Sequence, residues 1–284
     1  MLPIITLGVA EKILGAAKNG KKSVSVSLDL GKGASSAMID GTRVKVGDGA
    51  IPLEAFSKVK ENTCYVMDKS ELKAVELFSQ GTNLYYKLRP TTDWPTITLS
   101  SVPMHRFKHL SPRQDTQTKI EEISPVKGVV LDTCCGLGYT AIMASRGPER
   151  VDTFERDENV LKIASYNPYS QELFDNPKTT KIFLHKESIF GETGGIKSLS
   201  SENFDRIIHD PPTVSFAPEL YSAEFYKQLF RVMKRGGILY HYCPAPGKTK
   251  GRELFPSVEK RLRDAGFKNV KYSEKSSGIR ALKP

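Results

Sequence analysis

Apolar and polar positions follow two different patterns along the chain. Up to about residue 100, short runs such as KSVSVSLDLG (22–31) alternate apolar with polar residues, and this period of two is typical of half-buried strands. Asp40-Gly41 between two such runs indicates a β-hairpin. The spacing also predicts helices over 9–17 and 69–78. The first part of the chain is therefore expected to be β-rich, with two helices covering it.

From about residue 119, unbroken apolar runs alternate with amphipathic segments. Expected strands are GVVLDTC (128–134), VDTFERD (151–157), KIFLHKE (181–187), DRIIHD (205–210) and ILYHYC (238–243). Helices are expected after the glycines at Tyr139, over 158–167, and over 222–237 with Gly236 and Gly237 closing it. Such alternation predicts an α/β fold with a mostly parallel sheet covered on both faces.

The stretch between these two parts carries four prolines and is interpreted as a connection between domains. We expect a smaller N-terminal β-rich domain over 1–104 and a second domain over 105–284. Within the connection, HRFKHLSPR (105–113) mixes aromatic and basic residues, and Arg106 and Lys108 are candidates for contacts with phosphates.

Composition narrows the class of protein. No apolar stretch is long enough to cross a bilayer, so we expect a cytoplasmic protein without a membrane partner. None of the four cysteines has the spacing of a zinc site, and no metal is expected. The net charge of +10 permits a polyanionic partner such as RNA, because counterion release favours such binding. It does not identify the partner, and the oligomeric state stays open.

The turn after the first strand of the second domain carries the candidate cofactor chemistry. Gly136, Gly138 and Ala141 form a G-x-G-x-x-A pattern that also occurs in dinucleotide-binding proteins. Asp132, four residues before Gly136, would repel a pyrophosphate but attract the ammonium and sulfonium of S-adenosyl-L-methionine. Glu155, at the end of the next strand, is placed to accept hydrogen bonds from ribose hydroxyls. We therefore predict S-adenosyl-L-methionine, although Asp132 as a turn cap and Glu155 paired with Arg156 or Lys162 stay open.

These motifs occur in the order LDTCCGLG, FERD, HKES and HDPP, after four successive strands. In this order the chain resembles class I S-adenosylmethionine-dependent methyltransferases, and its longer phrases resemble predicted archaeal methyltransferases. The resemblance implies a seven-stranded Rossmann-like sheet with a reversed final hairpin, and Glu187 and Ser188 near the adenine. The residues expected to bind the cofactor are Asp132, Cys134, Gly136, Gly138, Tyr139, Thr140, Glu155, Arg156, Glu187, Ser188 and Asp210.

The fourth motif, IIHDPPT (207–213), supplies the expected catalytic residues Asp210, Pro211 and Pro212. It resembles the motif of methylases that act on exocyclic amino groups of bases. Such an amine is a poor nucleophile because its lone pair is conjugated into the ring. Asp210 and the carbonyl of Pro211 would accept its protons and turn the lone pair toward the methyl group. The sequence therefore predicts N-methylation of an RNA base.

The acceptor is less sharply defined. Thr213 stands where the motif normally has an aromatic residue, so Phe216, Tyr221 or Phe225 would have to supply the stacking ring. Arg106 and Lys108 are expected as further substrate contacts. We expect cytidine N4 in ribosomal RNA, with guanosine N2 in transfer RNA, or a protein or small amine, as alternatives. Cys243 suggests a rival cytosine-C5 methylase. A non-enzymatic RNA-binding protein and a nicotinamide dehydrogenase are the rivals from other classes.

Overall fold

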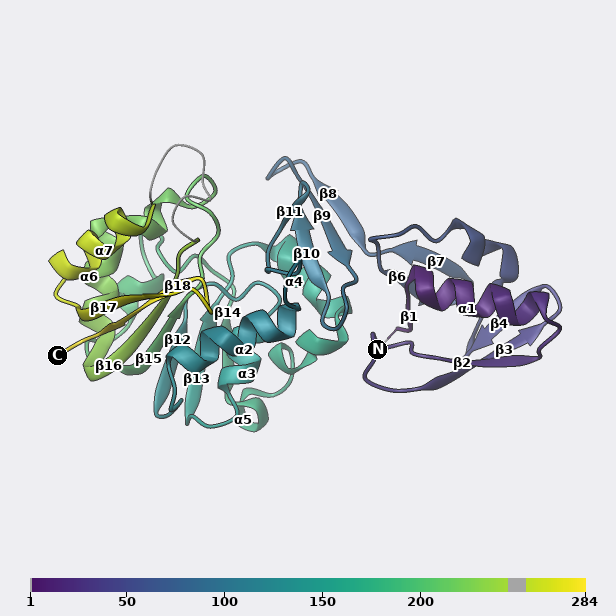
Figure 1. Ribbon diagram of the computed structural model, residues 1–284, viewed down its shortest axis with the longest axis horizontal. Coiled ribbons are helices and arrows are strands. Elements are labelled where there is room, and N and C mark those ends of the chain that lie inside the picture. The colour runs from purple at the N-terminus through teal and green to yellow at the C-terminus, as the bar shows by residue number, and fades with distance from the viewer. Residues whose placement is uncertain (1, 245–253) are drawn as a thin grey trace. The chain divides into compact units, whose positions relative to one another are not determined.

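The computed structural model describes residues 2–244 and 254–284, and the chain divides into two compact units. Unit 1 contains residues 1–113 and 159–171, and unit 2 contains residues 114–158 and 172–284. Figure 1 labels the elements of both units.

Unit 1 holds three antiparallel sheets, with strand orders β1-β6-β7, β2-β3-β4-β5 and β11-β10-β9-β8. The predicted hairpin at Asp40-Gly41 is confirmed, because Asp40 of β3 pairs with Arg43 of β4. Helix α1 packs its buried residues Ala10 and Ile13 into the same core as Val44. The elements are β1 (Ile4–Ile5), α1 (Leu7–Lys18), β2 (Ser23–Val26), β3 (Ser35–Asp40), β4 (Arg43–Val46), β5 (Gly49–Pro52), the 3-10 helix η1 (Leu53–Lys58), β6 (Tyr65–Asp68), β7 (Glu71–Ala74), β8 (Glu76–Ser79), β9 (Leu84–Arg89), β10 (Thr96–Leu99) and β11 (Val102–Pro103).

The helix expected over 69–78 is wrong, because this segment forms strands β7 and β8. Glu71 to Ala74 alternate between exposed and half-buried, and Glu76 to Ser79 repeat that alternation. A period of two is the pattern of a strand with one face against the core. The helical prediction gave too much weight to the propensities of Glu, Leu, Lys and Ala.

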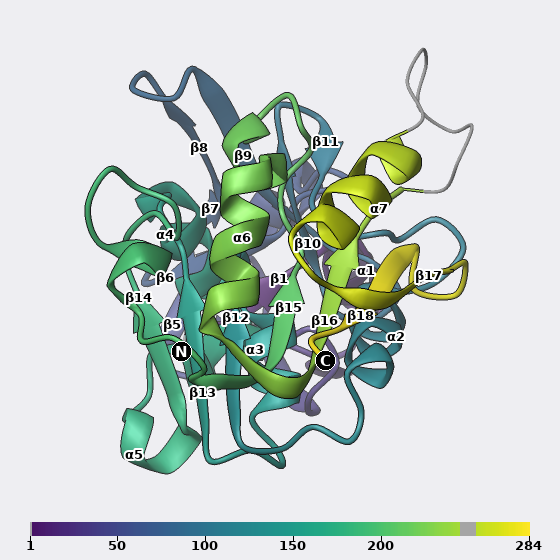
Figure 2. The same ribbon diagram turned by 90° about the vertical axis from the view of Figure 1, so that its left-hand side faces the viewer.

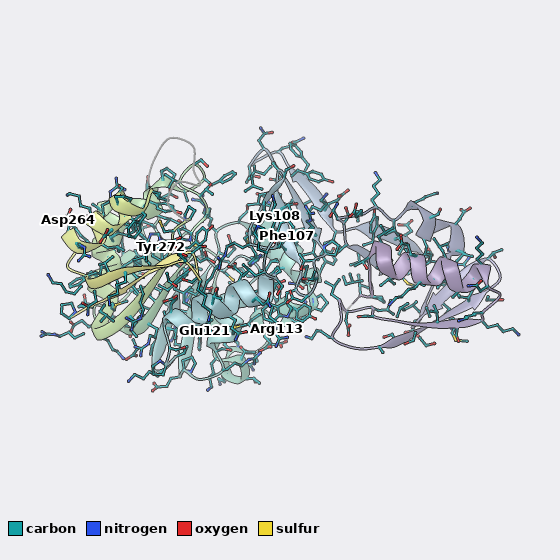
Figure 3. All side chains as sticks on the ribbon, in the orientation of Figure 1. Phe107, Lys108, Arg113, Glu121, Asp264 and Tyr272 are labelled. Carbon is teal, nitrogen blue, oxygen red and sulfur yellow. The ribbon has the colours of Figure 1, made fainter. Side chains whose placement is uncertain are left out.

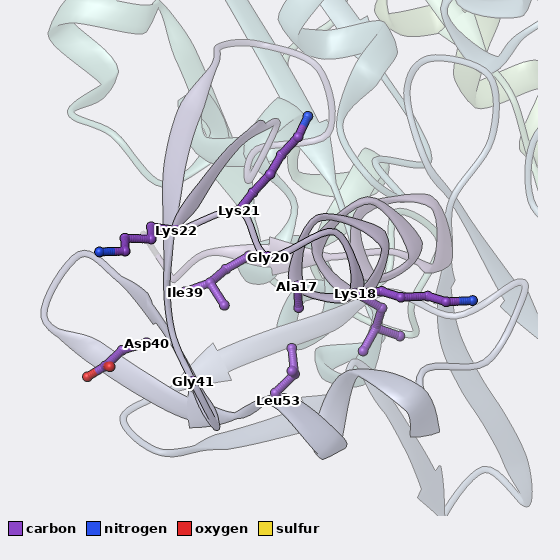
Figure 4. A pocket seen from close by; sticks show the side chains of 10 residues that line it. Ala17, Lys18, Gly20, Lys21, Lys22, Ile39, Asp40, Gly41 and Leu53 are labelled. Atoms are coloured by element: carbon purple, nitrogen blue, oxygen red, sulfur yellow. The ribbon is translucent and has the colours of Figure 1, made fainter.

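A cavity of about 630 Å³ lies in unit 1 at the end of α1, where α1 meets the β3–β4 turn and η1. Lys18, Lys21 and Lys22 line it, but their side chains point away from one another in Figure 4. An anion site needs donors that converge on one point. This cavity therefore lacks the geometry of a phosphate site.

Unit 2 is built on a seven-stranded sheet with the order β14-β13-β12-β15-β16-β18-β17. Strand β18 runs antiparallel to both of its neighbours, whereas β12 to β16 pair in parallel. The predicted Rossmann-like sheet with a reversed final hairpin is thus confirmed. Its strands are β12 (Val129–Asp132), β13 (Arg150–Phe154), β14 (Ile182–His185), β15 (Phe204–His209), β16 (Met233–Tyr242), β17 (Lys268–Ser273) and β18 (Gly278–Leu282).

Helices cover both faces of this sheet. Successive strand residues go to opposite faces, so that Leu131 joins one apolar cluster and Val130 the other. The cluster of Leu131 includes side chains of α6 and α7, which Figure 2 shows in front of β15 and β16. Side chains of α3 pack into the other cluster. The remaining elements of the chain are α2 (Pro112–Glu122), α3 (Tyr139–Ala144), α4 (Glu158–Tyr166), η2 (Pro168–Leu173), α5 (Pro177–Thr180), η3 (Gly195–Ser198), η4 (Pro218–Tyr221), α6 (Ala223–Val232) and α7 (Leu254–Asp264).

Helix α6 begins and ends at positions that its side chains and neighbours explain. Ser222 caps its start by accepting a hydrogen bond from the backbone N–H of Phe225. The expected end at Gly236 and Gly237 is wrong, since the helix stops at Val232 and β16 begins at Met233. The backbone N–H of Gly236 donates to the carbonyl of Lys283, so the two glycines belong to the sheet.

Candidate active site at the carboxyl edge of the sheet

Four acidic residues follow four adjacent parallel strands. Asp132 ends β12, Glu155 follows β13, Glu187 lies two residues after β14, and Asp210 follows β15. The register aligns Asp132 with Thr153 and with Ile208, so these strands end at the same edge of the sheet. In α/β sheets with this connectivity, ligands bind at the carboxyl ends of the strands. The carboxyl edge is therefore the candidate site, and it is rich in negative charge.

The glycine turn between β12 and α3 has the tight geometry that its sequence predicts. Gly138 has a φ of 79°, and a Cβ at this position would lie 2.2 Å from Cδ1 of Leu173. Gly136, with a φ of 55°, donates its N–H to Oε2 of Glu155 over 2.9 Å. Glycine is needed at both positions because a side chain there would be strained, and at Gly138 it would also clash.

Glu155 is held by the backbone on both of its oxygens. Oε2 accepts from Gly136, and Oε1 accepts from the N–H of Asp157 over 2.9 Å. Burial raises the pKa of Glu155 to about 7, although both hydrogen bonds lower it. Each oxygen keeps a second lone pair that could accept a further hydrogen bond, and the role of Glu155 in binding ribose hydroxyls stays a prediction.

Asp132 is fully buried beside the glycine turn. Its Oδ2 accepts hydrogen bonds from the hydroxyls of Thr140 (3.2 Å) and Thr153 (2.8 Å). Its Oδ1 is buried without a hydrogen-bond partner among the residues that the structure describes. Burial raises the pKa of this carboxyl to about 7, and Asp210 contributes to the rise. Because its oxygens are closed to solvent, Asp132 would attract a cationic ligand through space and not by direct contact.

Lys119 connects α2 to the catalytic candidate Asp210. Its ammonium lies 2.6 Å from Oδ2 of Asp210 and 3.0 Å from Oδ2 of Asp115, one helical turn earlier. The side chains of Asp115, Lys119 and Asp210 are 0%, 3% and 20% exposed. Burial alone would lower the pKa of Lys119, but the two carboxylates outweigh it and raise the pKa above its usual value. We call these three residues the acidic triad, and its net charge is −1 when both carboxylates are ionised.

The sequence prediction missed Asp115 and Lys119. A signal was present, because Asp and Lys four residues apart lie on one face of a helix. Pro112 was interpreted as a breaker, whereas it is the first residue of α2. Proline is well tolerated in the first turn of a helix.

The segment that follows Asp210 is fixed to the rest of unit 2 by several side chains. Pro211 is buried, Pro212 and Thr213 are exposed, and the hydroxyl of Tyr221 donates to the carbonyl of Pro212 over 2.9 Å. Tyr221 itself is 2% exposed. Phe216 keeps 37% of its surface exposed. Phe225, the third candidate ring, is fully buried, so of the three candidates only Phe216 presents a substantial surface to a ligand.

Arg156 reaches this segment and not the glycine turn. Its guanidinium donates to Oε1 of Glu219 (3.0 Å) and to the carbonyl of Phe216 (3.2 Å). The residue next to Glu155 is thereby connected to the segment next to Asp210. The alternative pairing of Glu155 with Arg156 is wrong in the structure, where the partner of Arg156 is Glu219.

The other residues that the sequence predicts to bind the cofactor differ in their exposure to solvent. Tyr139 and Thr140 are buried, whereas Cys134 is partly exposed in the turn. Burial raises the pKa of Cys134 well above its usual value, so its thiol stays protonated at neutral pH. Beyond β14, Glu187 is exposed and Ser188 is partly buried. The adenine-binding roles of Glu187 and Ser188 stay predictions.

Two buried histidines lie in the core under this edge. The hydroxyl of Thr133 and Nδ1 of His209 are 2.7 Å apart, and Nε2 of His209 is 3.1 Å from the carbonyl of Leu220. Nε2 of His241 is 2.8 Å from the hydroxyl of Tyr226. Burial lowers the pKa of His241 to about 4 and lowers that of His209 as well, so both rings are neutral at physiological pH. These contacts indicate a structural role.

Cys243 is fully buried, and burial raises the pKa of its thiol to about 12. A nucleophilic cysteine needs an accessible thiolate. Cys243 lacks both properties, which argues against its role as a C5-methylase nucleophile.

The basic candidates Arg106 and Lys108 belong to unit 1, close to strand β11 in the sequence. Their neighbour His105 is buried, with Nδ1 3.0 Å from the hydroxyl of Thr96. The guanidinium of Arg89 lies over the ring of Phe107, and Lys108 is exposed (Figure 3). Their role in binding a polyanion stays a prediction.

Two features are absent from the part of the chain that the structure describes. Residues 2–244 and 254–284 contain no group of three or more His, Cys, Asp or Glu arranged to hold a metal ion. Within the same residues, the longest apolar helices fall short of the length needed to span a bilayer.

Comparison with known proteins places these observations in a family. No family model matches the chain. It is 40% identical over 289 residues to the uncharacterized protein MJ1233 of Methanocaldococcus jannaschii, which covers 99% of this chain and 95% of that protein. The chain therefore belongs to the same family as that protein. A polyamine aminopropyltransferase of M. jannaschii is 30% identical over 133 residues, which are 45% of this chain and 42% of that enzyme.

A solved structure shares the fold. A spermidine synthase in complex with the transition-state analogue AdoDATO matches with a TM-score of 0.54 at 15% identity. The match covers 74% of this chain and 73% of that structure. The chain thus has the S-adenosylmethionine-dependent methyltransferase fold in a form like that of spermidine synthase.

These comparisons contradict the prediction of RNA base methylation and of a role in ribosomal RNA modification. Two named relatives that match a little under half of the chain are polyamine aminopropyltransferases, and the matched structure is a spermidine synthase. The error has a physical source. A carboxylate after the fourth strand suits any amine, and Thr213, where a stacking ring was expected, gave no support to a base. RNA as a partner stays an untested prediction.

Proposed function

We propose that this protein is an aminopropyltransferase, which transfers the aminopropyl group of decarboxylated S-adenosylmethionine to an amine of a polyamine. The named relative and the matched fold support this proposal. The observation that carries it is the acidic carboxyl edge, where the buried Lys119 is already shared by Asp115 and Asp210.

The proposed donor differs from S-adenosylmethionine by the absence of one carboxylate. S-adenosylmethionine carries a carboxylate on its methionyl group, whereas the decarboxylated form carries only the ammonium and the sulfonium. A carboxylate entering next to Asp132 and Asp210 would be repelled, and Lys119 already has two anionic partners. A dication without a carboxylate fits this edge better. Glu155, oriented by two backbone N–H groups, would hold the ribose.

The acceptor chemistry gives Asp210 a definite task. An alkyl amine has a pKa close to that of lysine, about 10, and is protonated at neutral pH. It becomes a nucleophile only after it loses a proton, unlike the neutral aromatic amine of a base. Asp210 is the member of the acidic triad with the most exposed side chain, and its carboxylate would accept this proton.

The reacting carbon of the donor is the aminopropyl carbon bonded to the sulfonium. This carbon accepts the amine's electron pair and forms a carbon–nitrogen bond, while the carbon–sulfur bond breaks and its electrons stay on sulfur. The products are the extended polyamine and 5′-methylthioadenosine. Phe216 and Val214, each 37% exposed on the segment after Asp210, offer apolar surface to the methylene groups of the acceptor.

The test is an assay of the purified protein with decarboxylated S-adenosylmethionine and a set of alkyl amines: diaminopropane, diaminobutane and spermidine. We expect at least one amine to be extended, as detected by mass spectrometry. Asp210→Asn should lower the rate at least a hundredfold, within the range typical of a lost general base. The matched control is Asp264→Asn, which removes a carboxylate from an exposed ion pair with Lys260 on α7. Extension of no amine, or an equal loss in both variants, would count against the proposal.

A further inference from the structure

The acidic triad contains a residue with no access to the site. Asp115 is fully buried on α2 and forms an ion pair with the same ammonium as Asp210, although Asp210 is 91 residues from Lys119 in the sequence. A second buried carboxylate is costly in free energy. Holding the lysine in place would need only one of the two.

We infer that Asp115 is a positioning residue that shares the charge of Lys119 and thereby keeps Asp210 basic enough to accept a proton from the acceptor amine. This inference rests on the proposed function. It goes beyond that function because it assigns a role to two residues of α2.

The effect of sharing follows from simple electrostatics. An aspartate paired with one lysine of its own is strongly stabilised as the anion and becomes a weak base. When a second carboxylate competes for the same ammonium, each carboxylate receives less stabilisation and also repels the other. The proton affinity of Asp210 is then higher than it would be in a simple ion pair. Without Lys119, the two carboxylates would repel each other directly, and one of them would keep a proton.

Other titratable groups surround the triad and are the same in every variant below. Asp132 of β12 is influenced by both Asp210 and Lys119, and Cys134 of the glycine turn is influenced by Asp210. Tyr221 of η4 also interacts electrostatically with Asp210, and the ring of Tyr242 of β16 lies 5.4 Å from the ammonium of Lys119. Cys134 and Tyr221 have raised pKa values and stay neutral near pH 7. Asp132 titrates near pH 7 and is itself influenced by Lys119, so the carbon-13 titration of Asp210 described below, together with the kcat profile, assigns a difference between variants to the triad.

The experiment measures the pH dependence of kcat for the wild type, Asp115→Asn, Lys119→Met and the double variant. We expect the acidic limb of the profile to move to lower pH in Asp115→Asn, by about one unit, with kcat at the plateau reduced roughly three- to tenfold. The limb should move to higher pH in Lys119→Met. The double variant should lie between the wild type and Lys119→Met, because it has neither the cation nor the second carboxylate.

The control variant is Glu121→Gln on the same helix, which removes an exposed ion pair with Lys275. Its profile should match that of the wild type. Binding of 5′-methylthioadenosine and the thermal unfolding midpoint check that each variant is folded. If Asp115→Asn does not fold, the comparison of Lys119→Met with the double variant carries the test, since both lack the ammonium.

A profile of Asp115→Asn equal to the wild type, or a double variant equal to Lys119→Met, would overturn the inference. A readout independent of turnover separates this outcome from failure of the proposed function. Titration of the Asp210 side chain, followed by carbon-13 NMR with Asp210→Asn as the assignment control, should give the same order of midpoints. Failure of the wild type to extend any amine would remove the proposed function, whereas an altered order in the NMR titration would remove the role of Asp115.

Discussion

Replacement of Asp132 by asparagine should stabilise the ligand-free protein at pH 8 and weaken its binding of a cationic donor. Asp132 is fully buried, and one of its oxygens has no hydrogen-bond partner among the described residues. The ionised side chain is therefore a source of instability that a cation above the glycine turn would relieve. Asparagine keeps the size of the side chain and removes its charge.

The magnitude follows from the pKa of Asp132, which burial raises from 3.8 to about 7. The unfolded chain releases this proton near pH 4, whereas the folded chain keeps it up to about pH 7. Stability is therefore lost as the pH rises through that interval, by about 4 kcal/mol at pH 8 and by less than about 2 kcal/mol at pH 5. Weaker hydrogen bonds from Thr140 and Thr153 would offset about 1 kcal/mol of the gain in the asparagine variant.

The assay is urea unfolding of the wild type and Asp132→Asn at pH 5 and pH 8, together with calorimetric binding of decarboxylated S-adenosylmethionine. The variant should gain stability mainly at pH 8 and bind the donor at least tenfold more weakly. Asp152→Asn is the matched control, because Asp152 is equally buried on β13 but bonded to Arg150 and His185. These partners lower the pKa of Asp152 against the effect of burial, so its replacement should destabilise. Loss of stability in Asp132→Asn at pH 8 with unchanged donor affinity would refute the reasoning.

Three further predictions follow from the site. Gly138→Ala should destabilise the fold by more than about 2 kcal/mol, because the new Cβ would clash with Leu173 and the backbone has a positive φ. Gly15→Ala within α1 places its Cβ in open space and should stabilise the fold by about 0.5–1 kcal/mol. Urea unfolding of both variants checks this. Arg156→Ala should change stability by less than about 1 kcal/mol. It should raise the acceptor KM several-fold with little change in donor KM, since the partners of Arg156 lie on the segment after Asp210. An acceptor KM equal to that of the wild type in steady-state kinetics would contradict this. Donor affinity should fall below pH 7, by up to tenfold per pH unit for each of Glu155 and Asp132 that takes up a proton. Calorimetry should find a weaker pH dependence for the uncharged 5′-methylthioadenosine.

The sheet of unit 2 could be predicted because its strands are unbroken apolar runs, each followed by a helix that covers a face. The order of the motifs then located Asp132, Glu155 and Asp210 at one edge. The strand pair over Glu71 to Ser79 was missed because its residues have high helical propensity, while their alternation decides the structure. Local propensity is a weak guide where tertiary packing decides.

The acidic triad could not be found from local sequence. Its connection between Lys119 and Asp210 spans 91 residues and depends on where α2 lies against the sheet. The predicted reaction failed for a related reason. Under the proposed function, the carboxylate after β15 would bind the acceptor amine, but whether that amine is alkyl or aromatic depends on the charge balance around it, which only the folded structure displays.

The nucleoside product formed by the wild-type protein tests the central claim most directly. The protein is incubated with spermidine and either decarboxylated S-adenosylmethionine or S-adenosylmethionine, and the nucleosides are separated and identified by mass spectrometry. We predict 5′-methylthioadenosine from the decarboxylated donor and no turnover of S-adenosylmethionine. S-adenosylhomocysteine together with a methylated amine would contradict the account.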